Sequence, residues 1–85
     1  MRNIYKFTCN YKGKSKTYSL LATNLNDAYE EAGRLIIDNY EDIDDDSCDI
    51  LDSANRKNWK TDVMPFLMAN ENMLLSNIEI VNNED

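Results

Sequence analysis

The chain has 85 residues, a formal net charge of −7 and 42% apolar residues, with two glycines and one proline. This length and apolar content predict one folded domain over residues 1–85 and exclude an intrinsically disordered chain. The absence of histidine removes the commonest general base and zinc ligand, and with it every Ser-His or Cys-His nucleophile pair. The sequence also lacks the glycine-rich motifs that bind phosphates or dinucleotides. We therefore predict no enzymatic activity, no cofactor and no bound metal.

Neither a signal peptide nor a membrane span is expected. The first residues lack an apolar segment of signal-peptide length, and no stretch is long enough to cross a bilayer. These features predict a soluble cytoplasmic protein that does not bind membranes. Cys9 and Cys48 are too few for a disulfide framework or a structural zinc site. We expect both to be reduced, and a disulfide between them is the open alternative.

Residues 1–22 alternate between apolar and polar side chains, which predicts a β-hairpin. A turn at Lys12 and Gly13 places Phe7 opposite Tyr18, so that both rings project from the same face of the hairpin. The predicted apolar face comprises Tyr5, Phe7, Cys9, Tyr11, Tyr18, Leu20 and Ala22. The predicted wet face pairs Lys6 with Ser19 and Thr8 with Thr17.

Residues 25–40 are predicted to form a helix that packs on the apolar face of the hairpin. Asn24 is a good N-cap, and Asp27 suits the positive end of the helix dipole. Glu30 and Arg34 are spaced to form a favourable pair on the exposed side. Apolar residues recur at spacings of three and four along one stripe: Leu25, Ala28, Tyr29, Ala32, Leu35, Ile36 and Tyr40.

The sequence patterns that indicate helices and strands are weaker after residue 40. Residues 41–52 form an acidic segment, residues 53–75 read as mixed and partly helical, and residues 77–81 read as a strand. The expected fold class is α+β. We expect a small antiparallel β-sheet, made of the N-terminal hairpin and a C-terminal strand, with one long helix and one shorter helix packed on one face.

Charge is divided unevenly along the chain. Residues 1–26 carry five bases and no acid, whereas residues 27–52 carry eleven acids and one base, a net charge of −10. Self-repulsion among so many acids destabilises a fold, so their concentration suggests a use beyond solubility. The alternatives are a solvated loop, a weak cation site and a surface that binds a partner.

The cation alternative rests on residues 42–53, "DIDDDSCDILDS", which resemble a calcium-binding loop at positions one, three and five. Position six is Ser47 instead of glycine, and position twelve is Ser53 instead of the bidentate glutamate. This departure predicts no dedicated metal site and at most weak binding of divalent cations.

The partner alternative treats the carboxylates as a binding surface. Carboxylates a few ångströms apart reproduce the charge pattern of a nucleic-acid backbone, so a basic groove that binds nucleic acid would attract them. We predict this acidic face to comprise Asp38, Glu41, Asp42, Asp44, Asp45, Asp46, Asp49 and Asp52. A protein-interaction domain without an inhibitory role is the remaining alternative.

Two further features carry competing interpretations. The hairpin lysines could contact nucleic-acid phosphates, but the hairpin aromatics are committed to the core and not displayed for stacking, so we predict no direct nucleic-acid binding. Trp59 and the methionines at 64, 68 and 73 read either as core or as a surface for a partner or a second copy. The oligomeric state predicted is monomer or homodimer.

Four features of the chain are shared with a known class of small proteins. They are the short length, the lack of catalytic residues, the hairpin-plus-helix opening "YKFTCNYKGKSKTYSLLATNLNDAYEEAGRLI" and the cluster "YEDIDDDSCDILD". The chain resembles small acidic inhibitors encoded by phages and other mobile elements, including anti-CRISPR proteins and other nucleic-acid mimics. This resemblance implies a stoichiometric inhibitor in the cytoplasm of a bacterial host. Its partner would be a basic nucleic-acid-binding protein or complex, such as a CRISPR effector.

Overall fold

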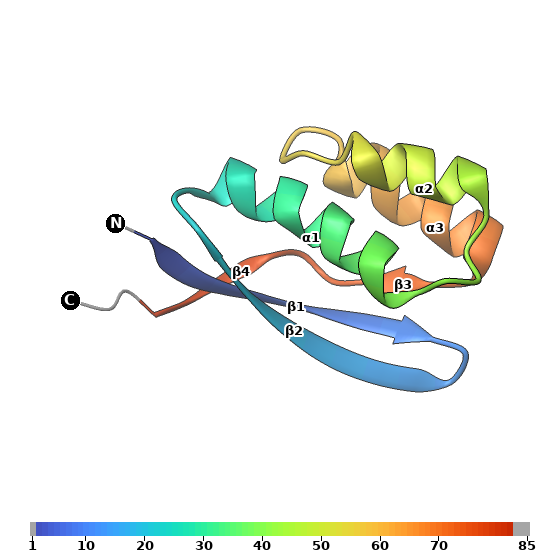
Figure 1. Ribbon diagram of the computed structural model, residues 1–85, viewed down its shortest axis with the longest axis horizontal. Coiled ribbons are helices and arrows are strands. Elements are labelled where there is room, and N and C mark those ends of the chain that lie inside the picture. Colours follow the sequence, from blue (N-terminus) through green and yellow to red (C-terminus); the bar gives the residue numbers. More distant parts are fainter. Residues whose placement is uncertain (1, 83–85) are drawn as a thin grey trace.

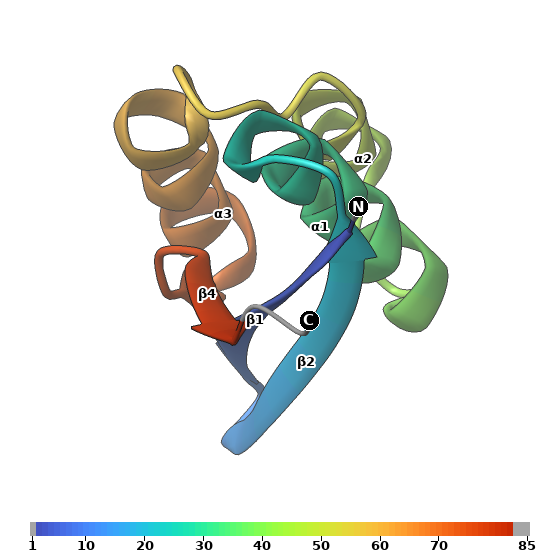
Figure 2. The same cartoon turned by 90° about the vertical axis from the view of Figure 1, so that its left-hand side faces the viewer.

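The computed structural model describes residues 2–82 and has the expected α+β fold, with an antiparallel sheet and all helices on one of its faces (Figures 1 and 2). The elements in chain order are β1 (Asn3–Tyr11), β2 (Lys14–Ala22), α1 (Leu25–Asn39), α2 (Asp45–Asp52), the π-helical turn η1 (Trp59–Val63), α3 (Met64–Glu71), β3 (Leu74–Leu75) and β4 (Glu79–Asn82). None of these helices is long and apolar enough to cross a membrane.

The predicted hairpin and its register are confirmed. Phe7 pairs with Tyr18 and Thr8 with Thr17, and the two threonine hydroxyls lie 3.1 Å apart on the wet face. The backbone φ is 53° at Lys12 and 77° at Gly13. Two consecutive positive φ angles produce the tight turn whose twist matches that of the two strands.

β1 lies at the centre of the sheet, with β2 along one edge and β3 and β4 one after the other along the opposite edge. The C-terminal strand was expected over residues 77–81, whereas β4 covers Glu79–Asn82 and is preceded by β3. Between β3 and β4, Ser76 bonds to β1 partly through its side chain and not by the regular backbone ladder. Its amide donates to the Thr8 carbonyl (3.0 Å), and its hydroxyl accepts from the Thr8 amide (2.8 Å).

α1 begins as predicted, since the Asn24 side chain accepts a hydrogen bond from the Asp27 amide. The helix ends at Asn39, one residue earlier than predicted, and Tyr40 is its C-cap. The apolar stripe packs on the sheet, with Ala28, Tyr29, Ala32, Gly33 and Ile36 buried.

The prediction of a single shorter helix after α1 was wrong, because α2 and α3 both form. In Figures 1 and 2, α1 and α3 lie nearest the sheet, and α2 packs on them from the far side. α2 runs antiparallel to α1 and buries Ser47 and Leu51. An eight-residue helix is marginal in isolation, so its formation depends on these tertiary contacts.

Residues 53–75 are only partly helical. Asn55 and Asn58 organise the turn before η1 through side-chain hydrogen bonds. The chain then widens into a π-helical turn just before Pro65, whose ring and missing N–H disturb regular helical bonding. α3 ends at Asn72, which adopts a left-handed conformation with φ 56°. Residues 74–75, expected in the mixed helical segment, are therefore a strand.

Of the two interpretations of Trp59, core or partner surface, the structure supports the core. The Trp59 side chain is 1% exposed, packs edge-on against Phe7, and donates its indole N–H to the Ser76 carbonyl at 3.0 Å. Met73 is fully buried as well, whereas Met68 is partly exposed at the surface. Cys9 is buried, Cys48 is half-buried, and no disulfide joins them in the structure.

Candidate acidic binding face

All eight residues of the predicted acidic face are exposed, and they come from one end of α1, the following connection and α2. Asp38 lies in the last turn of α1, and Glu41 and Asp42 lie in the connection. Asp44 is the N-cap of α2, which itself carries the remaining four: Asp45, Asp46, Asp49 and Asp52. A helix therefore orders most of the segment that could have been a solvated loop.

The strongest part of this face is the outward side of α2. Asp45, Asp49 and Asp52 follow one another at spacings of four and three, so they project from the same side of the helix. That side is opposite Ser47 and Leu51, which are fully buried. We call Asp45, Asp49 and Asp52 the α2 stripe.

Close packing on α1 holds α2 in place. A methyl group added to Gly33 would lie 2.2 Å from the backbone oxygen of Leu51 and 3.1 Å from the Ala54 side chain. Only a glycine permits this approach, because any Cβ would push the two helices apart. The α2 stripe is thus presented by a rigidly supported helix.

A polar network ties the N-terminus of α2 to the end of α3. The Asp44 carboxylate accepts hydrogen bonds from the Ser47 amide (2.9 Å) and from the Asn70 side chain. Glu71 in turn accepts from the Asp44 amide (3.0 Å) and from the buried Ser47 hydroxyl (2.8 Å). Asp44 therefore has a structural role that the sequence analysis missed. The spacing of Asp44 and Ser47, N-cap to third helical residue, was the available signal.

This cap should make stability sensitive to acid. The hydrogen bond from the Ser47 amide, followed by that from Asn70, lowers the pKa of Asp44 below its usual 3.8. A lowered pKa means that the cap contributes fully above pH 3.8 and that its contribution is lost as the pH falls below that value.

We expect Asp44→Asn, which cannot titrate, to lose less thermal stability than the wild type between about pH 7 and about pH 3. Thermal melts followed by circular dichroism measure this difference. Asp52→Asn, which removes the same charge without touching the cap, is the control. Parallel pH profiles for Asp44→Asn and the wild type would show that the cap does not contribute.

Asp42 is the member of the face that pairs with a cation. Its carboxylate forms an ion pair with Lys12 at the hairpin tip, and the hydrogen bond from Lys12 lowers the pKa of Asp42. Within residues 2–82 the only other ion pair joins Glu31 to Arg34. The α2 stripe, Asp46, Asp38 and Glu41 thus have no cationic partner in the described part of the chain.

The local potential at α2 is negative. Burial, reinforced by the charges of Asp45, Asp49 and Asp44, raises the pKa of the Cys48 thiol. A raised pKa keeps Cys48 protonated at neutral pH, so it is a poor nucleophile. The face therefore presents negative charge and hydrogen-bond acceptors at the surface.

The geometry does not favour the cation alternative. Residues 45–52 are helical, so the carboxylates radiate from a helix and do not converge as they do in a calcium-binding loop. Within the described residues no group of three or more acidic or cysteine side chains is arranged to hold a metal ion.

The acidic face thus combines a supported helix, an outward row of carboxylates and few intramolecular cations. Comparisons of the chain with known protein families, with curated proteins and with solved structures find no match.

Proposed function

We propose that this protein is a non-enzymatic inhibitor whose acidic face binds a basic, nucleic-acid-binding protein. The observation that carries the proposal is the α2 stripe, which is exposed on a supported helix and has no cationic partner within residues 2–82. Complementary charge of this kind speeds encounter with a basic groove and disfavours partners of like charge.

The spacing of the carboxylates supports mimicry of a phosphate backbone. With a helical rise of 1.5 Å per residue, the three charges of the α2 stripe lie about 6.0 Å and about 4.5 Å apart along one side of the helix. This spacing is of the same order as that of the phosphates of one strand in a nucleic-acid duplex, which recur about every 3.4 Å along the duplex axis. A groove that is lined with lysine and arginine for that strand would accept the helix.

Together with the resemblance to phage-encoded inhibitors, this charge pattern leads us to propose a bacterial host's cytoplasm as the place of action. CRISPR effectors are suitable targets, because they hold the guide–target duplex in a positively charged channel. The inhibitor would act by occupying such a channel in place of nucleic acid, as a monomer or a homodimer and without contacting nucleic acid itself.

The test removes charge from the α2 stripe without changing shape. Asp45→Asn, Asp49→Asn and Asp52→Asn together remove three negative charges. The matched control, Glu30→Gln, Asp62→Asn and Glu79→Gln, removes three charges outside the acidic face. A pull-down from bacterial lysate at low and high salt identifies the partner by mass. Association kinetics are then measured with the purified partner.

We expect the stripe variant to associate about tenfold more slowly at low salt and to show a weaker salt dependence, because steering charge has been removed. The control variant should behave like the wild type, and nucleic acid should displace the wild type from its partner. Equal affinity and equal salt dependence of the stripe variant and the wild type would rule out the proposal, as would a partner that nucleic acid does not displace.

A further inference from the structure

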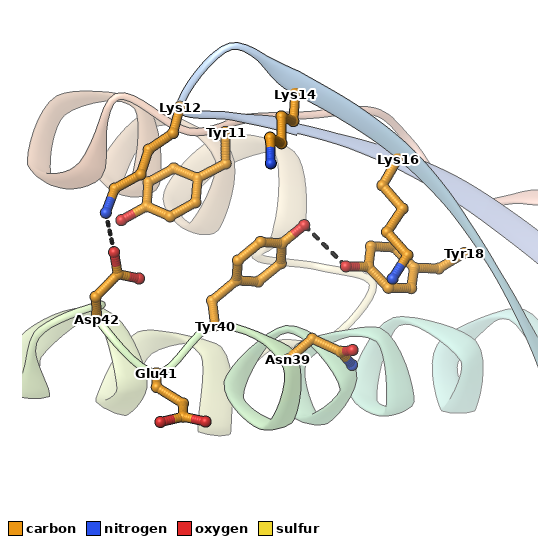
Figure 3. A pocket seen from close by; sticks show the side chains of 9 residues that line it. All are labelled: Tyr11, Lys12, Lys14, Lys16, Tyr18, Asn39, Tyr40, Glu41 and Asp42. Carbon is orange, nitrogen blue, oxygen red and sulfur yellow. Dashed lines mark hydrogen bonds and ion pairs between the residues drawn. The ribbon is translucent and has the colours of Figure 1, made fainter.

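A cleft of ≈ 440 Å³ lies between the tip of the hairpin and the C-terminal end of α1. Figure 3 shows that lysines reach down into it from the hairpin while Tyr40 rises from the opposite side. Its walls combine positive charge with tyrosine rings. The lining residues are Tyr11, Lys12, Lys14, Lys16, Tyr18, Asn39, Tyr40, Glu41 and Asp42.

Strand geometry explains why lysines point into this cleft. Side chains two residues apart on a strand share a face, so Lys14 and Lys16 lie on the same face as Tyr18. Their cross-strand partners, Tyr11 and Cys9, are buried on that face too. The hairpin tip extends past the end of α1 (Figure 1), so these two core-facing positions are left uncovered and carry lysines.

Lys14 and Lys16 are the free cations of the cleft. Lys12 is engaged with Asp42, but neither Lys14 nor Lys16 forms an ion pair within residues 2–82. The Lys16 ammonium lies 5.0 Å from the centre of the Tyr18 ring, which holds it over the cleft by a cation–π contact. Two ammonium groups therefore face a common space without an ion-pair partner, although Glu41 and Asp42 line its opposite side.

The tyrosines contribute an apolar wall whose hydroxyls are uncharged. The Tyr18 hydroxyl donates to the Tyr40 hydroxyl at 2.8 Å, and the rings of Tyr11 and Tyr40 pack edge to face at 5.3 Å. Burial, reinforced by the Tyr18 hydrogen bond, raises the pKa of Tyr40, and burial also raises that of Tyr11. Both hydroxyls therefore stay neutral at physiological pH and do not repel an anion.

Two other uses of these lysines fit less well. A base near the end of α1 would offset the helix dipole, but no hydrogen bond joins Lys14 or Lys16 to that helix end in the described residues. A nucleic-acid strand running through the cleft would meet Glu41 and Asp42 on its α1 side, where like charge repels it. A ligand with one compact anionic group avoids this repulsion.

We propose that the cleft binds the phosphate group of a small phosphorylated molecule. The Lys14 and Lys16 ammonium groups hold the phosphate, and the rest of the ligand lies against the rings of Tyr11 and Tyr40. Lysine binds phosphate as a point charge, and the cleft volume falls in the range of small-molecule sites. The cleft shares Glu41 and Asp42 with the acidic face but contains no residue of the α2 stripe, so either proposal can fail alone.

The test uses adenosine monophosphate as a probe, with adenosine and inorganic phosphate as comparison arms. Titrations are followed by two-dimensional NMR of backbone amides. We expect saturable shifts for the monophosphate, confined to residues 11–18 and 39–42. Inorganic phosphate should shift the same amides more weakly, and adenosine should shift none.

Lys14→Gln with Lys16→Gln should weaken binding of the monophosphate about tenfold or more, because it removes both charged contacts. Lys57→Gln with Lys60→Gln removes the same charge from a distant exposed site and should change nothing. If the double variant folds poorly, Lys14→Gln alone serves, and its thermal midpoint is compared with that of the wild type.

Three results would overturn the proposal. The first is the absence of saturable shifts at millimolar monophosphate, and the second is equal weakening in the Lys57 and Lys60 control. The third is tighter binding of a single-stranded oligonucleotide through the same residues, which would mark the hairpin tip as a nucleic-acid contact.

Discussion

Replacing Phe7 by alanine is expected to destabilise the protein by about 3–5 kcal/mol, the usual cost of emptying a buried aromatic site. Phe7 is 2% exposed. Its ring stacks on Tyr18 with centroids 5.3 Å apart and meets Trp59 edge-on at 6.2 Å. The substitution therefore removes the ring contacts that join the hairpin to η1. Domains of this size are stable by only about 5–15 kcal/mol, so a large share of the total is lost.

Chemical denaturation followed by tryptophan fluorescence measures this loss, since Trp59 is itself part of the affected contact. Leu21→Ala is the control, because Leu21 lies on the same hairpin but is 55% exposed. Its effect should stay within about 0.5 kcal/mol. A Phe7→Ala variant as stable as Leu21→Ala would mean that the hairpin does not form the floor of the core.

Replacing Gly33 by alanine is expected to destabilise the protein by about 1–3 kcal/mol, although the same change stabilises most helices. The added methyl group would lie 2.2 Å from the backbone oxygen of Leu51, and a backbone atom cannot move aside as a flexible side chain can. We expect α1 and α2 to move apart to relieve this close contact. Each kcal/mol should lower the thermal midpoint by about 4–8 °C in a domain of this size.

Thermal melts of Gly33→Ala test this expectation, with Arg34→Ala as the control on the exposed side of the same helix. Because α2 carries the stripe of carboxylates, Gly33→Ala should also weaken partner binding without altering the net charge. A raised thermal midpoint for Gly33→Ala would show that helix propensity outweighs the close contact.

The hairpin and α1 were predictable from local pattern alone. Alternation of apolar and polar residues over two strands leaves one register in which Phe7 and Tyr18 share a face, and Gly13 supplies a backbone geometry that few residues adopt. Asn24 and the apolar stripe define α1 in the same way. These signals act between residues close in sequence, so they can be read without knowledge of the remaining chain.

The second half of the chain depended on contacts between distant residues. Asn70 and Glu71 complete the cap of α2 from more than twenty positions away. Ser76 interrupts the pairing of the outer strand through hydrogen bonds to Thr8, which lies near the other end of the sequence. Short elements such as α2 and β3 gain their stability from these partners, and their own residues carry too weak a preference to reveal them.

The candidate sites divide along the same line. The concentration of acid in residues 27–52 follows from the sequence, and so does its value as a binding surface. The sequence does not reveal which of these carboxylates are accessible to a partner. Packing of Leu51 against Gly33 turns Asp45, Asp49 and Asp52 outward, whereas Lys12 engages Asp42. The cleft lined by Lys14 and Lys16 likewise exists only because the hairpin extends beyond the end of α1. Charge is a property of composition, but its accessibility depends on how the helices pack.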